Sequence, residues 1–362
     1  MPFPTGYTLW DEIVINHLKV GTGGTTNQDI WIPLTSLSGT AQATLLANGG
    51  DARFTLDDGT TQLAGHATLD SAGVLTGFRF KPSSLSDTVD TIIRLWYNGA
   101  DAALAVGDPY GQYATYDANT VGYWPLEEDP SGTAPQMLDR TSGATHGTTN
   151  GSMTSGDLIA GQVGNALDLD GANDSVALDY AIMSSPTEFT VETIAKATNT
   201  ATEYRLFSLG NSSMFVELRF NSLGVAGRIS VHTRSGGADI SVQTDAYDIT
   251  QFHHIMASVQ NNGTIDLIID GVLAATTAMG SISGFPANGF YIGASYGNDT
   301  WTLGVMDEVK LHSVYRSLAW AIVRANNEKT PATFFSSVTA MAASFNFGPP
   351  TLGPFSGPFR RR

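Results

Sequence analysis

Short segments of alternating polar and apolar residues, separated by glycine-rich turns, recur along this chain and restrict its fold more than any other feature. Segments such as "FTVETIAKA", "MFVELRFNS" and "GRISVHTRS" alternate in this way, and Asn-Gly, Asp-Gly and Gly-Asn pairs recur at turns along the chain. Short strands at near-regular spacing with such turns are typical of two-sheet antiparallel sandwiches. Thirty-nine glycines and only 14% charged residues agree with a turn-rich β protein.

The chain length of 362 residues favours two domains. Residues 1–116 contain a hairpin signal in "ARFTLDDGTTQLAGHATLD" and a strong strand in "TVDTIIRLWYN", and residues 117–330 form a second strand-rich unit. The phenylalanine- and proline-rich residues 331–362 predict an extended arm, either disordered or laid on a partner. The expected fold class is all-β: two antiparallel β-sandwich domains, a short C-terminal helix on the second, and then the arm.

Composition excludes several classes of protein. The chain has no cysteine, so it has neither a disulfide framework nor a thiolate metal site. Its net charge of −16 argues against nucleic acid or an anionic membrane as a partner. No stretch reaches the ~20 apolar residues of a membrane span, so membrane insertion is not expected. The first twenty residues lack the basic and apolar regions of a signal peptide, so none is predicted.

Residues 117–330 contain four motifs, which are in order "YWPLEEDPSG…MLDRTSGATHGT", "GNALDLDGANDSVAL", "FHHIMASVQNNGTIDLIIDGVLAA" and "FYIGAS…LGVMDEVKLHSVYRSLAWAIV". With these motifs in the order of that family, the region resembles the laminin-G-like jelly rolls of the concanavalin A-like superfamily. The third motif carries Phe252 where the family usually has tryptophan. The resemblance implies a jelly roll with the concanavalin A-like fold. In that fold the last strand runs beside the opening strand, and a short helix then packs over the sandwich edge.

Residues 1–116 contain the segments "GGDARFTLDDGTTQL" and "TIIRLWYNGADAA". Through these segments the region resembles a small β-domain of unknown function that often precedes such jelly rolls in bacterial and phage proteins. That family has no established activity, so this resemblance implies architecture only.

The segment "GVMDEVKLH" alternates like a strand and places Asp307 on the same face as apolar residues. In the family that the segment resembles, the acid at this position commonly helps to bind a structural cation, together with backbone carbonyls. A hard cation such as Ca²⁺ takes about six to eight oxygen ligands, so carbonyls near Tyr123 and around Asp170 are the expected companions. Alternatively, Asp307 caps a loop or pairs with a basic neighbour such as Arg316. From Ser317 the spacing of apolar residues becomes helical.

The densest acidic cluster is Asp168, Asp170 and Asp174. Its oxygens suit calcium, and Asp170 is therefore a candidate ligand. The favoured alternative is that Asp170 and Gly171 form a turn that Asp174 caps, because the spacing does not match the EF-hand template.

A second group of acids, Glu127, Glu128 and Asp129, raises the question of a glycosidase, which uses two carboxyl groups a fixed distance apart. Sugar-cleaving relatives on this fold carry alternating acids along one strand, whereas "FTVETIAK" offers only Glu192. Three consecutive acids before Pro130 predict a solvated loop instead. A protein that is not an enzyme is therefore expected.

Aromatic and polar residues gather around the loop "GASYGNDTW", which joins two late strands. An exposed aromatic ring covers the apolar face of a sugar, while Asn and Asp bond its hydroxyl groups. A carbohydrate site is therefore predicted at Tyr291, Tyr296, Asn298, Asp299 and Trp301. The alternative is that Trp301 is a core residue of the closing hairpin.

These features predict a structural protein of a phage virion, such as a capsid decoration, fibre or tail-associated component, with a lectin-like domain for host surface glycans. The expected partners are other virion proteins, further copies of the chain and a cell-surface glycan, and the expected location after synthesis in the host cytoplasm is the virion. The arm is expected to attach to a neighbouring subunit through Phe345, Phe347, Phe355, Phe359, Arg360, Arg361 and Arg362. The alternative is a lectin module of a bacterial surface or secreted protein that acts on polysaccharide.

Overall fold

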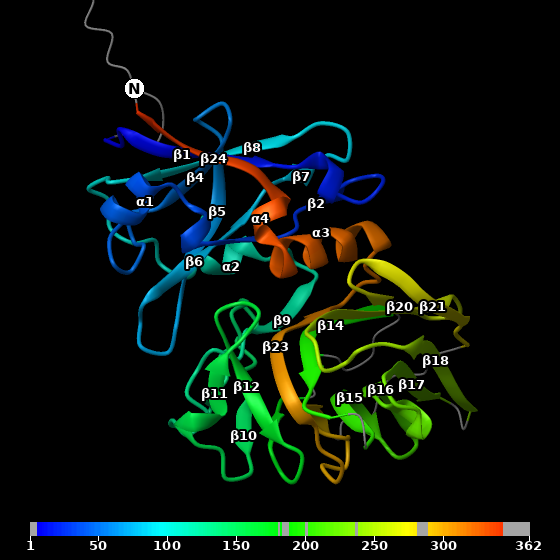
Figure 1. Ribbon diagram of the computed structural model, residues 1–362. Helices are drawn as coiled ribbons and strands as arrows, with labels where there is room; N and C mark the ends of the chain where they lie inside the picture. The colour runs from blue at the N-terminus through cyan, green and yellow to red at the C-terminus, as the bar shows by residue number, and fades with distance from the viewer. Residues whose placement is uncertain are drawn as a thin grey trace, which may run out of the picture.

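The computed structural model describes residues 6–179, 182, 188–199, 202–235, 238–280 and 289–342, and it contains two β-rich units with a helix between them (Figure 1). Most of the regular structure is antiparallel sheet, which confirms the predicted all-β class. The predicted arm residues Phe345, Phe347, Phe355, Phe359 and Arg360–Arg362 lie outside the described residues.

The first unit is built on a seven-stranded sheet in the order β24-β1-β8-β4-β5-β6-β3. Its strands are β1 (Leu9–Ile15), β3 (Ile30–Pro33), β4 (Arg53–Leu56), β5 (Gln62–Leu69), β6 (Leu75–Lys81), β8 (Thr91–Tyr97) and β24 (Phe335–Ala342). The unit also contains a ribbon and two short helices, which are β2 (Thr25–Thr26), β7 (Ser84–Leu85), α1 (Gly39–Thr44) and α2 (Gln112–Thr115). Strand residues bury a core around Ile13, Phe54, Phe78, Phe80 and Leu95.

The last described strand of the chain completes this first unit. β24 pairs with β1 from Leu9↔Ala342 to Ile15↔Phe335, and α4 (Pro331–Phe334) leads into it. Phe334 and Phe335 are both buried in the core of the first unit. Residues 331–342 therefore belong to this unit, whereas the sequence placed the start of the arm at residue 331. Most side chains of β24 are exposed, so its sequence lacks the apolar alternation of a buried strand.

The second unit is a sandwich of two antiparallel sheets. The front sheet has the order β10-β13-β22-β15-β16-β17-β18, and the back sheet has the order β11-β12-β23-β14-β19-β20-β21 with β9 paired to β23. The front strands are β10 (Thr148–Asn150), β13 (Ser175–Ala177), β15 (Tyr204–Asn211), β16 (Met214–Phe220), β17 (Arg228–Ser235), β18 (Ala238–Ala246) and β22 (Phe290–Ile292). The back strands are β9 (Thr120–Trp124), β11 (Leu158–Ala160), β12 (Asn165–Asp170), β14 (Glu188–Ala197), β19 (His253–Gln260), β20 (Thr264–Ile269), β21 (Val272–Ala278) and β23 (Leu303–His312).

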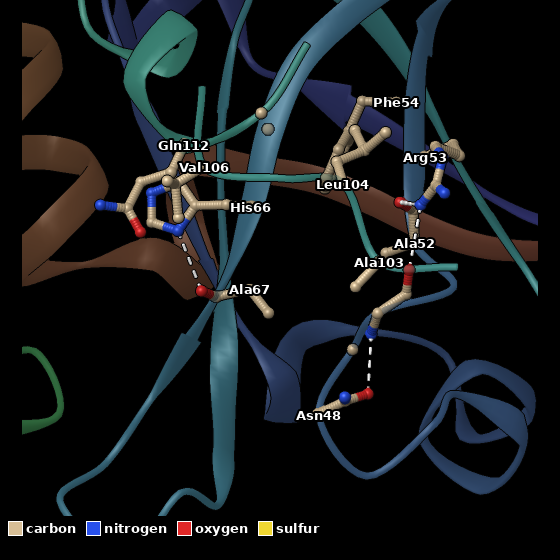
Figure 2. Close-up of a pocket in the computed structure, with 14 residues that line it drawn as sticks. Asn48, Ala52, Arg53, Phe54, His66, Ala67, Ala103, Leu104, Val106 and Gln112 are labelled. Carbon is tan, nitrogen blue, oxygen red and sulfur yellow. Dashed lines mark hydrogen bonds between the residues drawn. The ribbon is translucent and has the colours of Figure 1, made fainter. Parts of the chain in front are cut away.

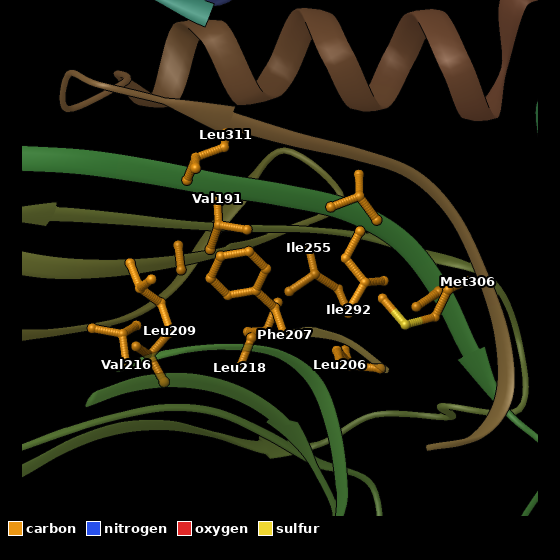
Figure 3. Close-up of a cluster of buried hydrophobic side chains, with 14 of the residues drawn as sticks. Val191, Leu206, Phe207, Leu209, Val216, Leu218, Ile255, Ile292, Met306 and Leu311 are labelled. Atoms are coloured by element: carbon orange, nitrogen blue, oxygen red, sulfur yellow. The ribbon is translucent and has the colours of Figure 1, made fainter. Parts of the chain in front are cut away.

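Apolar side chains from both sheets fill the space between them. Val191 and Leu311 of the back sheet meet Phe207 and Leu218 of the front sheet in one buried cluster (Figure 3). Val309 pairs with Trp124, which sets the closing strand β23 beside the opening strand β9. This confirms the strand arrangement that the family resemblance implied.

Helix α3 (Leu318–Lys329) lies between the two units (Figure 1). It begins where the helical spacing predicted, because the Ser317 Oγ accepts a hydrogen bond from the backbone N–H of Trp320 at 3.4 Å. Toward the first unit, the Asn327 side chain bonds the N–H and the C=O of Trp31, at 2.8 and 2.7 Å. Toward the second unit, Trp320 packs in a small cluster with Met256 of the back sheet. The helix is therefore a shared element of both units.

Buried charges also connect the units. The junction network comprises Asp29 and Arg79 of the first unit and Glu308, Lys310, Arg324 and Glu328 of the second, each at most 2% exposed. Arg324 binds Asp29 at 2.6 Å, and Lys310 binds Glu328 at 3.0 Å. Arg79 reaches across to Glu308 and to Glu328. Because buried ion pairs are stable only in a fixed geometry, this network holds the two units in one relative orientation.

Candidate functional site

The surface of the front sheet that points away from the sandwich core, here called the front face, carries aromatic and charged side chains. On β16, Val216 and Leu218 belong to the core. Successive strand residues point to opposite sides, so Phe215, Glu217 and Arg219 project onto the front face. This strand therefore presents a ring, a carboxylate and a guanidinium in a line.

Cross-strand pairing extends this line sideways into a row. Tyr291 of β22 pairs with Ser208 of β15, Ser208 with Glu217 of β16, and Glu217 with His232 of β17. Side chains that are paired in this way lie about 5 Å apart on their common face. The row therefore sets an aromatic ring, a hydroxyl, a carboxylate and an imidazole side by side, with Ser208 and Glu217 buried beneath their neighbours and Tyr291 and His232 partly exposed.

Aromatic rings stack at one end of the front face. The Tyr296 ring lies over the Phe215 ring with centroids 5.0 Å apart and an interplanar angle of 24°. His232 meets the same Phe215 ring edge-on at 5.2 Å, and the Arg234 guanidinium lies 5.5 Å from its centroid. Phe215 is buried by these neighbours, while Tyr296 stays partly exposed. Tyr296 is therefore the outer ring of a supported aromatic stack.

The charged side chains of the front face form ion pairs with one another. Glu217 lies between Arg205 and Arg219, at 2.9 and 2.5 Å, and both arginines also bind Glu203. These pairs fix the positions of several N–H donors beside the aromatic stack.

Two further groups extend this set of donors and acceptors. Arg234 binds Asp239 at 2.6 Å, and the hydrogen bond from Arg234 lowers the pKa of Asp239. Burial, followed by the charge of Arg219, lowers the pKa of His232, which is therefore neutral at pH 7. Its Nδ1 atom is buried without a hydrogen-bond partner among the described residues. The front face thus holds one neutral imidazole with an unused nitrogen.

The five residues predicted for a carbohydrate site do not all lie on the front face. Tyr291 and Tyr296 contribute to the front face. Asn298 and Asp299 shape the loop instead: the Asn298 Oδ1 accepts from the Trp301 Nε1 at 3.0 Å and from the Ser175 Oγ at 3.1 Å, and the Asp299 Oδ1 accepts from the Ser295 Oγ at 2.5 Å. Trp301 is partly exposed and lies outside the main core cluster.

Sequence reasoning missed the residues that support Tyr296, namely Phe215, Glu217, Arg219, His232 and Arg234. The sequence does contain a pattern that could have found these residues. In "MFVELRF" and "RISVHTRS" the core positions alternate with positions that include the five missed residues.

The two predicted metal ligands lie apart. Asp170 pairs with Leu303, and Asp307 lies four residues further along β23, so they are roughly 13 Å apart. The Asp170 Oδ1 accepts from the backbone N–H groups of Ala172, Asn173 and Asp174, as in the turn interpretation. One ion cannot bind both carboxylates, and among the described residues no group of three or more acids and histidines could hold a metal.

Asp307 is instead influenced by two other acids, Glu308 and Glu127. Its Oδ2 accepts from the N–H groups of Gln162 and Val163 at 2.9 Å each, while its buried Oδ1 has no partner among the described residues. Burial and the charge of Glu308 raise the pKa of Asp307 well above its usual value, and Glu127 adds to this effect. Burial also raises the pKa of Glu127 to about 8. Glu127 was expected in a solvated loop but is only 5% exposed, because the chain folds its segment against the back sheet beside β23.

These two acids flank one tight turn. The backbone N–H of Gly161 bonds the carbonyl of Gly164 at 2.9 Å. A Cβ atom on Gly161 would lie 2.6 Å from the Asp307 Oδ2, and one on Gly164 would lie 2.2 Å from the Glu127 Oε1. Two buried carboxyl groups with raised pKa values, one of them with an unpaired oxygen, therefore lie against the same tight turn.

A cavity of about 160 Å³ in the first unit carries no comparable chemistry (Figure 2). The polar groups that line it bond to neighbouring protein atoms: Arg53 to the carbonyl of Gly50 at 3.0 Å, Asn48 to the N–H of Gly50 at 3.0 Å, and His66 to the carbonyl of Ala67 at 2.9 Å. The hydrogen-bonding capacity of these groups is satisfied by the fold itself.

Among the helices that the structure describes, none is long and apolar enough to cross a membrane.

Comparison with known proteins identifies the second unit. Residues 170–322 match the family model of the concanavalin A-like lectin/glucanases superfamily. The second unit is a laminin-G-like jelly roll of this superfamily, as the four motifs predicted. The corresponding resemblance of residues 1–116 stays a prediction. No curated protein matches the chain in sequence.

Several solved structures are similar to part of the chain. The binding domain of Paraclostridial Mosquitocidal Protein 1 has 13% identity and a TM-score of 0.46, over 57% of this chain and 52% of that one. Domain 4 of AbnA, a GH43 extracellular arabinanase from Geobacillus stearothermophilus, in complex with arabinotriose, has 16% identity and a TM-score of 0.43, over 57% and 98%. The binding domain of botulinum neurotoxin DC in complex with SialylT has 9% identity and a TM-score of 0.43, over 59% and 52%. The matched region thus spans about half the length of the two toxin chains.

Proposed function

Because the second unit is a jelly roll of the concanavalin A-like lectin/glucanase superfamily, we propose that this chain is a carbohydrate-binding protein that is not an enzyme. The front face is the proposed binding surface. The observation that carries this proposal is the stack of Tyr296 on Phe215, held beside His232 and Arg234. A sugar ring packs its C–H groups on such an aromatic ring, while adjacent donors and acceptors bond its hydroxyl groups.

Binding without cleavage is the activity that the charges of the front face favour. A glycosidase needs carboxyl groups that can exchange a proton with the glycosidic oxygen or with water. Glu217 and Glu203 are instead shared between the same two arginines. Their role in this proposal is to hold the guanidinium groups in place as hydrogen-bond donors for a ligand.

The test uses a glycan array followed by titration calorimetry on each glycan that binds. Tyr296→Ala removes the exposed ring and should weaken binding roughly tenfold or more, which corresponds to about 1.4 kcal/mol. Tyr110 of the first unit is an exposed tyrosine remote from the front sheet, so Tyr110→Ala is the matched control. If the Tyr296→Ala protein and the wild type bind the glycan with equal affinity, the front face is not the binding site.

We further propose that the chain is a structural component of a phage virion, such as a capsid decoration, fibre or tail-associated protein. A chain without cysteine suits synthesis and assembly in a reducing cytoplasm. Two units fixed by a buried network also suit a rigid particle component. Mass spectrometry should find the chain in purified particles. Recovery only from particle-free culture supernatant would favour the alternative, a lectin module of a bacterial surface or secreted protein.

We also propose that Asp307 and Glu127 hold a structural cation such as Ca²⁺, with backbone carbonyls of the neighbouring turn. The unpaired Asp307 Oδ1 and the raised pKa values of both acids support this. A bound divalent ion would neutralise the two carboxylates and so fix the turn at residues 161–164 to the closing strand.

A further inference from the structure

The two edges of the sheet in the first unit differ in how their backbone groups are bonded. At the edge strand β3, the Asn327 side chain of α3 bonds the N–H and the C=O of Trp31. At the opposite edge, β24 pairs with β1 on the side of the unit away from the jelly roll (Figure 1). In the part of the chain that the structure describes, nothing except β1 bonds the backbone of Ser336–Ala342. The outward N–H and C=O groups of this segment are therefore free to pair with another strand.

β24 also lacks the features that protect most edge strands from pairing. Natural edge strands are usually very short, or they carry charged residues or proline. The segment Ser336–Ala342 is largely exposed and contains neither a charged residue nor a proline. The absence of charge extends along the sequence from Thr330 to Phe359. β24 is therefore an open edge that favours the addition of a strand.

The edges of the two jelly-roll sheets are better protected. β10 and β11 are only three residues long. β18 carries two exposed acids, Asp239 and Asp245. β21 is uncharged, but it lies against β18 of the facing sheet. Among the described edge strands of the large sheets, β24 is therefore the most accessible to another strand.

A second copy of the chain fits this edge better than the arm of the same chain. An arm that folded back along β24 would need several consecutive N–H donors, and proline has none. After Gly348 the proline-free runs are only 351–353, 355–357 and 359–362. β24 itself has an N–H at every position from Ser336 to Ala342, and two copies of it bring no like charges together.

We propose that two copies of the chain pair through their β24 edges, antiparallel and around a twofold axis, so that one continuous sheet runs through both first units. A twofold interface uses the same surface of both copies, as this pairing does. The segment Ser336–Ala342 is centred on Thr339, so pairing over its whole length sets Thr339 opposite Thr339 of the other copy. Ser337 then lies opposite Met341 of the other copy.

The net charge of −16 does not oppose this contact directly. The acids of β1 are Asp11 and Glu12, which pair with Ala340 and Thr339. Each is separated from its counterpart in the other copy by at least three strand spacings, or roughly 14 Å. This separation exceeds the Debye length of about 8 Å at physiological ionic strength, so salt screens the repulsion.

The experiment measures the mass of the full chain in solution by analytical ultracentrifugation over a range of concentrations. The wild type should form a dimer. In Thr339→Lys the new side chain faces Glu12 across β1, which suits the fold of one copy, but two lysines meet in the dimer. The dissociation constant of the dimer should therefore rise about tenfold or more, while the melting curve of the variant keeps both units folded. Thr276→Lys, at an exposed threonine of the uncharged edge strand β21, is the matched control and should leave the dimer unchanged.

Disulfide formation tests the register, because the natural chain has no cysteine. Paired residues of antiparallel strands have Cα atoms about 4.5–5.5 Å apart, within the range that a disulfide spans. Thr339→Cys should therefore give a covalent dimer on mild oxidation. Ser336→Cys should not, because pairing centred on Thr339 places the two copies of Ser336 about 20 Å apart.

Four results would overturn the proposal. The first is a wild type that stays monomeric at every concentration, which would leave the edge to a strand of a different protein. The second is a dimer that Thr339→Lys does not weaken, and the third is a dimer that Thr276→Lys weakens equally. The fourth is cross-linking of Ser336→Cys as readily as Thr339→Cys.

Discussion

At the scale of single residues, Asp307 has two carboxyl oxygens with different surroundings. Its Oδ2 caps the loop at Gln162 and Val163, which is the loop-capping alternative of the sequence interpretation, and its buried Oδ1 has no partner within the part of the chain that the structure describes. These features are compatible, since one oxygen can fix the loop while the other binds a cation. In the proposed cation site Glu127 takes the place of the predicted partner Asp170, because Asp170 caps its own turn.

Removing a divalent cation should therefore destabilise the protein. We expect chelator to lower the melting temperature by several degrees, since a ligand at a hundred times its Kd stabilises the native state by about 2.7 kcal/mol. Asp307→Asn and Glu127→Gln should each abolish most of the difference between chelator and added Ca²⁺, measured by differential scanning calorimetry. Asp170→Asn is the matched control and should keep it. Superimposable wild-type melts with and without chelator would contradict a structural cation.

At the scale of elements, α3 carries Arg324 and Glu328 into the junction network. Burial alone would raise the pKa of Glu328, but Lys310, Arg324 and Arg79 outweigh it and lower the pKa to about 2. A carboxyl group with a lowered folded-state pKa adds stability above its unfolded pKa, near 4.5, and loses it as the pH falls toward 2. The attachment of α3 is therefore sensitive to acid.

We predict that Glu328→Gln lowers the free energy of unfolding at pH 7 by about 3 kcal/mol, because it leaves buried cations without an anion. Urea unfolding at a series of pH values measures this difference. It should shrink between pH 4.5 and 2, where the wild-type carboxylate becomes protonated. Asp245→Asn, at an exposed acid, should leave stability unchanged at every pH. A constant difference down to pH 2 would show that Glu328 does not act through its charge.

The elements also show how far sequence reasoning extends. Alternation predicted the buried strands of the second unit, and helical spacing predicted the start of α3, because both signals are local. β24 was missed, since an edge strand with exposed side chains has no apolar alternation. Tyr296 was predicted as part of a site, but its support by Phe215 depends on a loop folding back onto a distant strand. Only tertiary structure provides contacts of that kind.

At the scale of the whole molecule, the two units depend differently on the end of the chain. Deleting residues 348–362 removes no described strand, so we expect both units to stay folded. As the sequence predicted for the arm, we expect this deletion to prevent oligomerisation or attachment to the particle. Light scattering and a particle-binding assay provide the measurements. Normal assembly of the shortened protein would rule out the arm as the attachment segment.

A longer deletion, of residues 335–362, should have a different effect. It removes β24 and with it Phe335, which exposes an edge of β1 and part of the first core. We expect the first unit to melt at a lower temperature while the second unit, whose strands all precede residue 313, keeps its own transition. Calorimetry separates the two transitions. A single unchanged transition would mean that β24 adds nothing to stability.

The pairing of β24 with β1 also has a consequence for biosynthesis. In chain order the jelly roll is an insertion between two parts of the first unit. β1 is therefore translated early, whereas its pairing strand β24 is translated after all the strands of the jelly roll. The jelly roll can fold while the chain is still growing, whereas the first unit cannot finish until translation has passed β24. Until then one edge of its sheet is open to other nascent chains or to a chaperone. A premature stop near the end of the message would therefore damage the unit at the opposite end of the polypeptide.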